Sequence, residues 1–515
     1  MTSGTRGATK RAMLYQLCRA GAHFEVGDGA TVLGMRPVVL GRGDATTSDP
    51  GGGLLYTDDP WMSVRHAQIT PLERKGTDSS RGLAAGMPSR WVVEDLGSTN
   101  GVLVNGVPSK RGPLLHGDLI ETGRTFWLYI EEPAIDPPLA EPVELGGIAT
   151  WTPYYGRQLA ELLPRVTGPE HVLVSGPPGS GKGFLARTIH VVSGRAGRFV
   201  HLECRGRRLR RLSADLFGDD NQPGRLREAD GGTLFLENIE ALPLEVQDRL
   251  VEAAHRKAYF PEGRARTRSL GLSARLVAST SLGIEEAIAA NQLRPGIVDA
   301  LGAVVMRVPA LEQRLPDLGL LIDDFLSRGR GAPAISRDAC RALVRYPFKL
   351  NARALGHVVE AAAVLAAKPD AKLPGGTGGQ IEVIHLPVDV VGPETLKRLV
   401  TGGPESVPDN TSEMTPVPGS RPPPGGGSSF EQEPTDPESL QTRAALRGSA
   451  GTAAPSGQAP PFEVGSGEGA GTTLEADDIV RALAAAHGNV SSAARALGRP
   501  RALVLRLMRE HGIER

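Results

Sequence analysis

The sequence predicts a multidomain fold: an all-β sandwich, a parallel α/β domain followed by helices, and an all-α tail. Three observations support this prediction. Short β-like runs separated by glycine turns fill residues 12–132. Apolar runs alternate with helical stretches between about 150 and 330, which is typical of a parallel sheet. Helical periodicity returns at 474–515, after a long segment rich in Gly, Pro, Ser and Thr.

Composition narrows the class of protein. A chain of 515 residues has room for roughly three domains. The formal net charge is zero, so a nucleic-acid surface must be local rather than spread over the whole chain. Cys18, Cys204 and Cys340 are odd in number and widely spaced, which favours a reducing compartment. Because no apolar run has the length of a signal or a spanning helix, we expect a cytoplasmic protein with no membrane partner.

Shifts in composition predict the domain boundaries. The sandwich covers 12–132, and a proline-rich linker covers 133–149. The α/β domain then extends over 150–330, and mostly helical residues follow over 331–400. Residues 401–473 have few aromatic side chains and much Gly and Pro, so we expect them to be a disordered linker. The helical tail occupies 474–515.

Three short motifs stand in order within the β-rich segment. They are LGR at 40–42, SVRH at 63–66 and GSTNGVLVNG at 97–106. Loops at one end of a sandwich can bring Arg42, Ser63 and Asn100 together. Such a set suits a phosphate dianion, since the guanidinium supplies charge-assisted hydrogen bonds and the neutral groups fix orientation. The alternative is that Arg42 and Asn100 only brace the loops.

This segment resembles a forkhead-associated (FHA) domain, a family that reads phosphothreonine peptides. The resemblance implies a partner in a Ser/Thr kinase pathway and a phosphopeptide site made of Arg42, Ser63, Arg65 and Asn100. Family members usually carry a basic residue directly after the serine, whereas here Val64 follows and Arg65 comes one place later. In a regular strand Arg65 would face away from Ser63, which predicts reduced affinity. We expect His66 to be a core histidine.

Residues 171–183 read HVLVSGPPGSGKG, an apolar run followed by a glycine loop with a lysine. The loop matches GxxxxGK through Lys182. Backbone N–H groups of such a loop, at a helix N-terminus, surround phosphate oxygens while the lysine adds positive charge. The predicted nucleotide-binding residues of the loop are Gly176, Gly179, Ser180, Gly181, Lys182 and Gly183. Because Gly183 stands in the Ser/Thr place, the usual hydroxyl ligand of magnesium is missing.

Further motifs continue the α/β pattern. They are LFG at 216–218, READGGTLFLENIEALPLEVQDRL at 227–250, ARLVAST at 274–280, LRPGIVDAL at 293–301 and YPFKLNARAL at 346–355. Together they resemble the AAA+ domain of bacterial enhancer-binding proteins, the sigma-54-dependent transcription activators, over about 145–400. The resemblance implies a ring-forming ATPase with a helical lid, ATP with magnesium as ligand, and sigma-54 RNA polymerase as partner. It also implies that Arg353 is the lid arginine that senses phosphate.

The chain departs from this family in the parts that carry activity. Active members have a GAFTGA loop between LFG and the GGTLFL strand, and that loop touches sigma-54. Here the interval is only DDNQPGRLREAD. The family's aspartate–glutamate pair is replaced by Glu237 and Asn238. Glu237 can still reach magnesium through one more methylene, but Asn238 cannot take a proton from water.

The residues that complete the family's nucleotide site are changed as well. Arg294 fits one of two arginines that reach the neighbouring subunit's γ-phosphate, whereas Ala300 occupies the other place and Ser281 replaces an asparagine. An arginine finger is worth about 10³–10⁵ in rate. The degenerate set of Glu237, Asn238 and Arg294 therefore predicts a site that binds ATP or ADP and hydrolyses poorly or not at all. The alternative is that binding is also lost and the module only oligomerises.

The tail carries three short helical patterns that break at HGN and LGRP. Asn489 suits a helix cap, and Pro500 suits a first helical turn. GNVSSAARALG before a basic third helix resembles the Fis-type helix-turn-helix of the same activators. The resemblance implies DNA contacts from Arg499, Arg501, Arg506 and Arg509. A helical dimerisation hairpin is the alternative.

The sequence therefore predicts a three-module, homo-oligomeric transcriptional regulator that binds phosphothreonine, ATP and DNA. Because of the departures, we expect it not to remodel sigma-54 polymerase in the usual way. Two alternatives stay open: an active sigma-54-dependent activator with a rebuilt site, and a phospho-dependent signalling scaffold.

Overall fold

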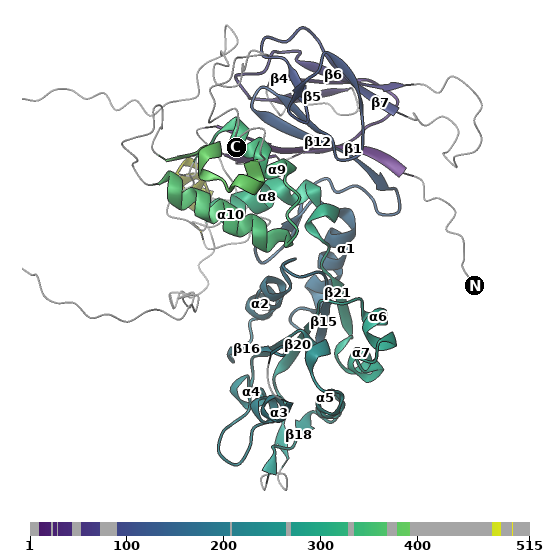
Figure 1. Cartoon of the computed structure of the whole chain (residues 1–515), viewed down its shortest axis with the longest axis vertical. Helices are drawn as coiled ribbons and strands as arrows, with labels where there is room; N and C mark the ends of the chain where they lie inside the picture. The colour runs from purple at the N-terminus through teal and green to yellow at the C-terminus, as the bar shows by residue number, and fades with distance from the viewer. Residues whose placement is uncertain are drawn as a thin grey trace, which may run out of the picture.

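A computed structural model of the chain describes residues 10–21, 24–27, 29–43, 53–72, 90–206, 209–263, 269–327, 334–367, 379–391, 476–485 and 497. The predicted linker 401–473 and most of the predicted tail lie outside the described residues. Within the described part, no helix combines the length and apolar character needed to cross a membrane. Figure 1 shows a β-sandwich, a separate α/β sheet, and a group of helices beside the sandwich.

The amino-terminal part is a sandwich of a seven-stranded and a five-stranded sheet, as the sequence predicts. The first sheet has the order β2-β1-β12-β11-β8-β9, with β3 beside β1, and the second has the order β10-β7-β6-β4-β5. Alternating side chains such as Leu40, Ile69 and Ile120 fill the space between the sheets. The strands are β1 (Lys10–Arg19), β2 (Glu25–Val26), β3 (Ala30–Val32), β4 (Val38–Arg42), β5 (Leu54–Thr57), β6 (Ala67–Leu72), β7 (Arg90–Asp95), β8 (Val102–Val104), β9 (Val107–Pro108), β10 (Arg111–Leu114), β11 (Leu119–Thr122) and β12 (Thr125–Pro133).

The central part is a five-stranded sheet with the order β16-β17-β20-β15-β21. All of its neighbouring strands are parallel, which confirms the predicted α/β class. The strands are β15 (Val172–Ser175), β16 (Phe199–Glu203), β17 (Thr233–Glu237), β20 (Arg275–Thr280) and β21 (Val304–Arg307). Every residue of β15 and β20 is buried, as expected for strands covered on both faces.

Helices cover both faces of this sheet. Helices α1 (Pro153–Leu162) and α2 (Lys182–Ser193) contribute Leu159 and Leu185 to one hydrophobic cluster. The other face carries α3 (Leu209–Phe217), α5 (Leu244–Arg256) and α7 (Pro295–Leu301), whose apolar residues belong to a second cluster. The remaining elements are α4 (Arg225–Glu228), α6 (Ile284–Ala289), η3 (Leu163–Arg165), η4 (Ile239–Ala241), η6 (Leu311–Gln313), η7 (Leu315–Asp317), β13 (Val143–Leu145), β14 (Ile148–Thr150), β18 (Ala258–Tyr259) and β19 (Leu270–Gly271).

The helical lid packs directly against the sandwich (Figure 1). One hydrophobic cluster joins Leu17 and Phe126 of the sandwich to Ile322, Leu343 and Leu355 of the helices. Helix α8 approaches β1 so closely that a Cβ at Gly319 would lie 2.0 Å from the Leu17 carbonyl oxygen. The elements of this part are α8 (Leu318–Ser327), α9 (Arg337–Arg345), α10 (Asn351–Ala366), α11 (Val388–Val391), β22 (Ala334–Ile335), β23 (Gln380–Ile381) and η8 (Val383–His385).

Candidate functional site

The glycine loop connects β15 to α2 at the carboxyl end of the sheet. Gly176, Gly179 and Gly181 have positive φ angles of 153°, 75° and 109°. At Gly179 a Cβ would also lie 2.0 Å from the carbonyl oxygen of Leu350, so the loop requires glycine there for space as well as conformation. Gly181 caps α2, and Lys182 is the first residue of the helix. The loop therefore presents backbone N–H groups at a helix N-terminus, the arrangement that binds phosphate.

Lys182 is buried at this loop, with 6% of its surface exposed. Its Nζ donates to the carbonyl oxygens of Gly176 at 2.7 Å and Pro177 at 3.0 Å, and to Ser281 Oγ at 3.2 Å. Burial lowers the pKa of Lys182 to about 8. Among the described residues, the buried Oγ of Ser180 has no hydrogen-bond partner. A buried ammonium and an unpaired hydroxyl beside a glycine cradle fit the oxygens of a polyphosphate.

The residues at the end of β17 differ in their surroundings. Glu237 Oε2 accepts a hydrogen bond from His201 Nε2 at 2.8 Å, and this bond lowers the pKa of Glu237. Asn238 is buried and adopts a left-handed conformation with φ of 58°. Its Nδ2 donates to both carboxylate oxygens of Glu203, at 3.0 and 3.2 Å. Ser281 Oγ donates to Asn238 Oδ1 at 3.0 Å, so Asn238 bridges Ser281 and Glu203.

A magnesium ion would find few protein ligands here. Gly183 carries no hydroxyl, and Glu237 is the carboxylate that ends β17. No group of three or more His, Cys, Asp or Glu residues that could hold a metal ion occurs in the part of the chain that the structure describes. The residues present therefore fit a metal that is held mainly by the phosphates and by Glu237.

The lid contacts the glycine loop through two hydrogen bonds. Asn351 Nδ2 donates to the Pro178 carbonyl oxygen at 2.8 Å, and the Arg353 N–H donates to that of Gly179 at 3.1 Å. The side chain of Arg353 is exposed, and its charge lowers the pKa values of both Lys182 and Glu237. The structure thus brings Arg353 to the same site as the glycine loop, which is the P-loop of this chain.

Arg294 lies on another part of the domain. It caps the start of α7, and its Nε is 3.1 Å from Asp248 Oδ1 on α5. Its N–H donates to Gln247 Oε1 at 2.8 Å. Because α7 and α2 contribute to clusters on opposite faces of the sheet, Arg294 is not gathered with the P-loop of its own chain.

The interval after the LFG motif is a compact turn. The Asp219 N–H donates to the Gln222 carbonyl oxygen at 3.0 Å. Asp219 Oδ1 accepts hydrogen bonds from the N–H groups of Asn221 and Gln222, each at 2.8 Å. The chain then enters α4 at Arg225. The interval after LFG is therefore a four-residue turn that leads into α4.

The predicted phosphopeptide residues gather at one end of the sandwich. Arg42 ends β4, and its N–H donates to the Ser63 carbonyl oxygen at 2.9 Å. Ser63 Oγ accepts from the Thr99 N–H at 3.2 Å, and Asn100 Nδ2 donates to the Trp61 carbonyl oxygen at 2.8 Å. The Nε of Arg42 is buried and has no hydrogen-bond partner among the described residues. These contacts join three loops around an unpaired guanidinium nitrogen.

His66 braces the same loops from inside. It is fully buried, and its Nδ1 accepts from the Ser63 N–H at 3.1 Å. Its Nε2 lies 2.9 Å from the Gly101 carbonyl oxygen and must carry the proton, because Nδ1 is the acceptor. Burial lowers the pKa of His66. The side chain is thus a core histidine, as expected.

Arg65 lies outside this brace. Strand β6 begins only at Ala67, so the premise that Arg65 belongs to a regular strand is wrong. Its side chain is exposed, next to Val64, which is 56% exposed. The alternation of a strand therefore does not fix the direction of Arg65.

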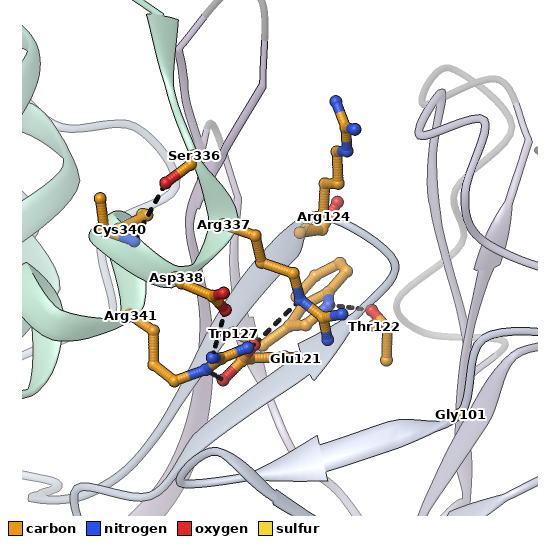
Figure 2. A network of polar contacts seen from close by, with 12 residues as sticks. Gly101, Glu121, Thr122, Arg124, Trp127, Ser336, Arg337, Asp338, Cys340 and Arg341 are labelled. Atoms are coloured by element: carbon orange, nitrogen blue, oxygen red, sulfur yellow. Dashed lines mark hydrogen bonds and ion pairs between the residues drawn. The ribbon is translucent and has the colours of Figure 1, made fainter. Parts of the chain in front are cut away.

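A buried ionic cluster connects the sandwich to the lid, as Figure 2 shows. Glu121 of β11 has no exposed surface. Arg341 of α9 donates to its two oxygens at 2.6 and 2.7 Å, and Arg337 donates to one of them at 3.1 Å. Arg341 also pairs with Asp338 at 2.6 Å. Sequence analysis missed this cluster, because Glu121 and Arg341 are 220 positions apart and no local motif marks them.

The four arginines predicted to contact DNA, at 499, 501, 506 and 509, lie outside the described residues. Of the predicted tail, the structure describes α13 (Ala476–Ala485) and residue 497.

Two family models match the chain. Residues 38–123 match the FHA domain, and residues 156–306 match the sigma-54 interaction domain. Both resemblances noted in the sequence are thereby confirmed at the level of these domains. The FHA domain is the all-β sandwich, and the sigma-54 interaction domain contains the parallel sheet and the P-loop.

Several of the proteins that are similar to this chain are regulatory proteins by name. The chain is 32% identical over 231 residues to the alginate biosynthesis transcriptional regulatory protein AlgB of Pseudomonas syringae pv. tomato, covering 42% of this chain and 49% of AlgB. It is 31% identical over 268 residues to the transcriptional regulatory protein ZraR of Salmonella typhimurium, covering 49% of this chain and 60% of ZraR. The chain thus spans about half the length of the curated relatives that it matches.

A solved structure of NtrX from Brucella abortus in complex with ATP covers 70% of this chain and 67% of that chain, with 20% identity and a TM-score of 0.40. From the two matching domain models, the conclusion is that this chain carries an FHA domain followed by a sigma-54 interaction domain.

Proposed function

We propose that this chain is a DNA-binding regulator of transcription that holds ATP in its P-loop and phosphothreonine in its FHA domain. The observation that carries the nucleotide part is the buried Lys182, whose ammonium donates to neutral acceptors of the glycine loop and to Ser281. Gly176, Gly179, Gly181, Ser180 and Gly183 form the cradle, and Arg353 of the lid faces it. The names of AlgB and ZraR, two relatives that are transcriptional regulatory proteins, support the regulatory part.

Its action on sigma-54 polymerase differs from that of an active remodelling ATPase. Two features support this: the compact turn at 219–222, where the contact loop of active members stands, and the amide of Asn238, which cannot accept a proton from water. Hydrolysis of ATP is therefore slow. Open-complex formation in a purified sigma-54 system tests the point, with the full chain compared to an active regulator. Measurable activation by this chain would favour the alternative of a working activator.

The phosphothreonine site is formed by Arg42, Ser63 and Asn100, with the exposed Arg65 at its edge. The unpaired, buried Nε of Arg42 supports this assignment, since phosphate oxygens would satisfy it. A phosphothreonine peptide library titrated against the full chain should give binders that Arg42→Ala abolishes. Lys10→Ala is the matched control. Lys10 lies opposite Pro133 at one end of the ladder between β1 and β12, and Thr125 lies at the other end of that ladder. Equal binding by the Arg42 and Lys10 variants would remove the assignment.

DNA binding through Arg499, Arg501, Arg506 and Arg509 belongs to the same proposal, with the chain acting as a homo-oligomer. Phosphate contacts by these arginines predict binding that weakens steeply with salt. A gel shift with Arg501→Ala and Arg506→Ala separates this function from the scaffold alternative. A shift that is insensitive to both substitutions would favour the scaffold.

A further inference from the structure

A row of hydrogen bonds leads from the P-loop lysine to a carboxylate on β16, Glu203. Lys182 Nζ donates to Ser281 Oγ at 3.2 Å, and Ser281 Oγ donates to Asn238 Oδ1 at 3.0 Å. Asn238 Nδ2 then donates to the two oxygens of Glu203 at 3.0 and 3.2 Å. Because a P-loop lysine reaches the β- and γ-phosphates, this row begins where a γ-phosphate would bind.

Glu203 lies at the carboxyl end of the sheet, where the P-loop also lies. It is the last residue of β16 and pairs in register with Glu237, the last residue of β17. The carboxyl ends of parallel strands are the edge at which ligands bind in open α/β sheets. Glu203 and Asn238 thus form an amide–carboxylate pair in which the acid stands on β16 and the amide follows β17.

Three carboxylates surround this end of the sheet, and they differ in the groups that bind them. Glu237 is bound by His201, and this bond lowers its pKa and weakens it as a base. Glu240 Oε1 is bound by the guanidinium of Arg205 at 2.8 Å. Glu203 instead accepts hydrogen bonds from neutral amides, which are the Asn238 side chain and the Arg205 N–H at 2.9 Å. Glu203 is also the carboxylate at the end of the row of hydrogen bonds that starts at Lys182.

We propose that Glu203 is the general base for slow ATP hydrolysis at this P-loop, in place of a residue at position 238. This inference rests on the proposed nucleotide binding. The oxygen of a water molecule bonds to the γ-phosphorus, and a proton of that water passes to the Glu203 carboxylate. The bond between the γ-phosphorus and the β–γ bridging oxygen breaks, and its electron pair leaves with ADP. The products are ADP and inorganic phosphate, and the carboxylic acid returns its proton to solvent.

The first test measures binding and does not depend on turnover. Glu203→Gln removes one negative charge while keeping the shape of the side chain. Affinity for a non-hydrolysable ATP analogue should rise roughly three- to tenfold, the effect of one nearby charge in a partly solvated site. Affinity for ADP should rise less, because ADP lacks the phosphate closest to Glu203. An equal change for both nucleotides, or no change, would show that Glu203 does not face the γ-phosphate.

The second test moves the carboxylate. Glu203→Gln should lower single-turnover hydrolysis by the full chain at least about 100-fold, the contribution of a general base. The double exchange Glu203→Asn with Asn238→Glu keeps one amide–carboxylate pair and should restore turnover to within about tenfold of the wild-type rate. Binding of the ATP analogue by Glu203→Gln shows that this variant is folded, so its loss of turnover then reports the missing carboxylate.

The outcomes distinguish this inference from the proposed function. A wild-type chain that binds the ATP analogue but shows no hydrolysis would overturn the role of Glu203 and leave nucleotide binding intact. A wild-type chain that binds no nucleotide would overturn the proposed function itself. Loss of turnover in Glu240→Gln, with turnover retained in Glu203→Gln, would assign the base to Glu240 instead.

Discussion

At the scale of single residues, the nucleotide site depends on what surrounds Lys182. Moving a charged ammonium out of water costs free energy. Lys182 is already buried in the folded protein, and carbonyl oxygens of its own loop accept its hydrogen bonds. Burial lowers its pKa to about 8, so near neutral pH the folded protein holds a positive charge at a cost. Phosphate oxygens would offset that cost, and this gives the site its preference for anions.

The pKa of Lys182 makes ATP affinity depend on pH. Phosphate charges raise the pKa of the bound lysine above the value of about 8 in the free protein. The complex therefore holds more protons than the free protein above that pH, so affinity is full below it and falls by up to about tenfold per pH unit above it. Isothermal titration of the full chain at several pH values measures this. Lys182→Arg, whose guanidinium stays charged, should bind with little pH dependence; an equal fall in both proteins would contradict the explanation.

Gly183 offers a second prediction at this scale. A Cβ at Gly183 would lie 3.6 Å from Phe235 Cε1, an ordinary contact, so a serine fits there. Gly183→Ser restores the hydroxyl that P-loops direct at magnesium. The ratio of ATP affinity with magnesium to that with a chelator should rise about fivefold or more, because the ion gains a protein ligand. The same ratio in the wild type and in Gly183→Ser would show that the ion is held elsewhere.

At the scale of elements, the lid and the sandwich are joined by charge as well as by apolar packing. Helix α9 places Arg337 and Arg341 against Glu121 of β11, where the carboxylate has no exposed surface (Figure 2). A buried carboxylate costs several kcal/mol to desolvate unless cations and hydrogen bonds compensate it. The α9–β11 contact is therefore specific in its position: a shift of the helix would leave these charges buried without partners.

Removal of Glu121 should destabilise the protein strongly. Glu121→Gln leaves two arginines facing a neutral amide in a buried setting, and breaking such a pair costs about 3–5 kcal/mol. Asp338→Asn is the control, because Asp338 is 38% exposed and pairs with the same Arg341. Its loss should cost less than about 1 kcal/mol. Denaturant unfolding of the full chain compares the two, and similar midpoints would contradict a structural role for Glu121.

At the scale of the whole molecule, the sequence predicted the modules better than their contacts. The short β-like runs, the GPPGSGKG loop and the TLFLEN strand each carry a local signal, and the structure contains the expected β-sandwich and parallel α/β sheet. The FHA loops are also local, so Arg42, Ser63 and Asn100 could be named from their motifs. Contacts between distant segments carry no such signal.

The missed residues show the reason. The replacement of an acid by Asn238 could be recognised from the sequence, because the preceding GGTLFLE motif fixes its position. Glu203 lies on another strand and became visible only when β16 and β17 paired in register. In the same way, Leu17 and Ile322 belong to one hydrophobic cluster although they are 305 positions apart in the sequence. Buried partners at such distances are selected by packing, which periodicity alone does not encode.

The hydrophobic cluster that joins the sandwich to the lid physically connects the two predicted binding sites. The sandwich end that carries Arg42 belongs to the domain that packs on the lid, and the lid touches the P-loop through Asn351 and Arg353. Any coupling between phosphothreonine and ATP must be reciprocal in their affinities.

ATP binding by the full chain tests the central claim most directly, with the wild type compared to Lys182→Ala. Lys257→Ala is the matched control. The Lys257 carbonyl oxygen accepts a hydrogen bond from the Leu272 N–H, just before β20 begins, whereas the P-loop follows the carboxyl end of the neighbouring strand β15. The wild type and Lys257→Ala should bind alike, and Lys182→Ala should lose at least about tenfold in affinity, the value of a charge-assisted hydrogen bond. Equal ATP affinity in all three proteins, or no binding by the wild type, would contradict the account.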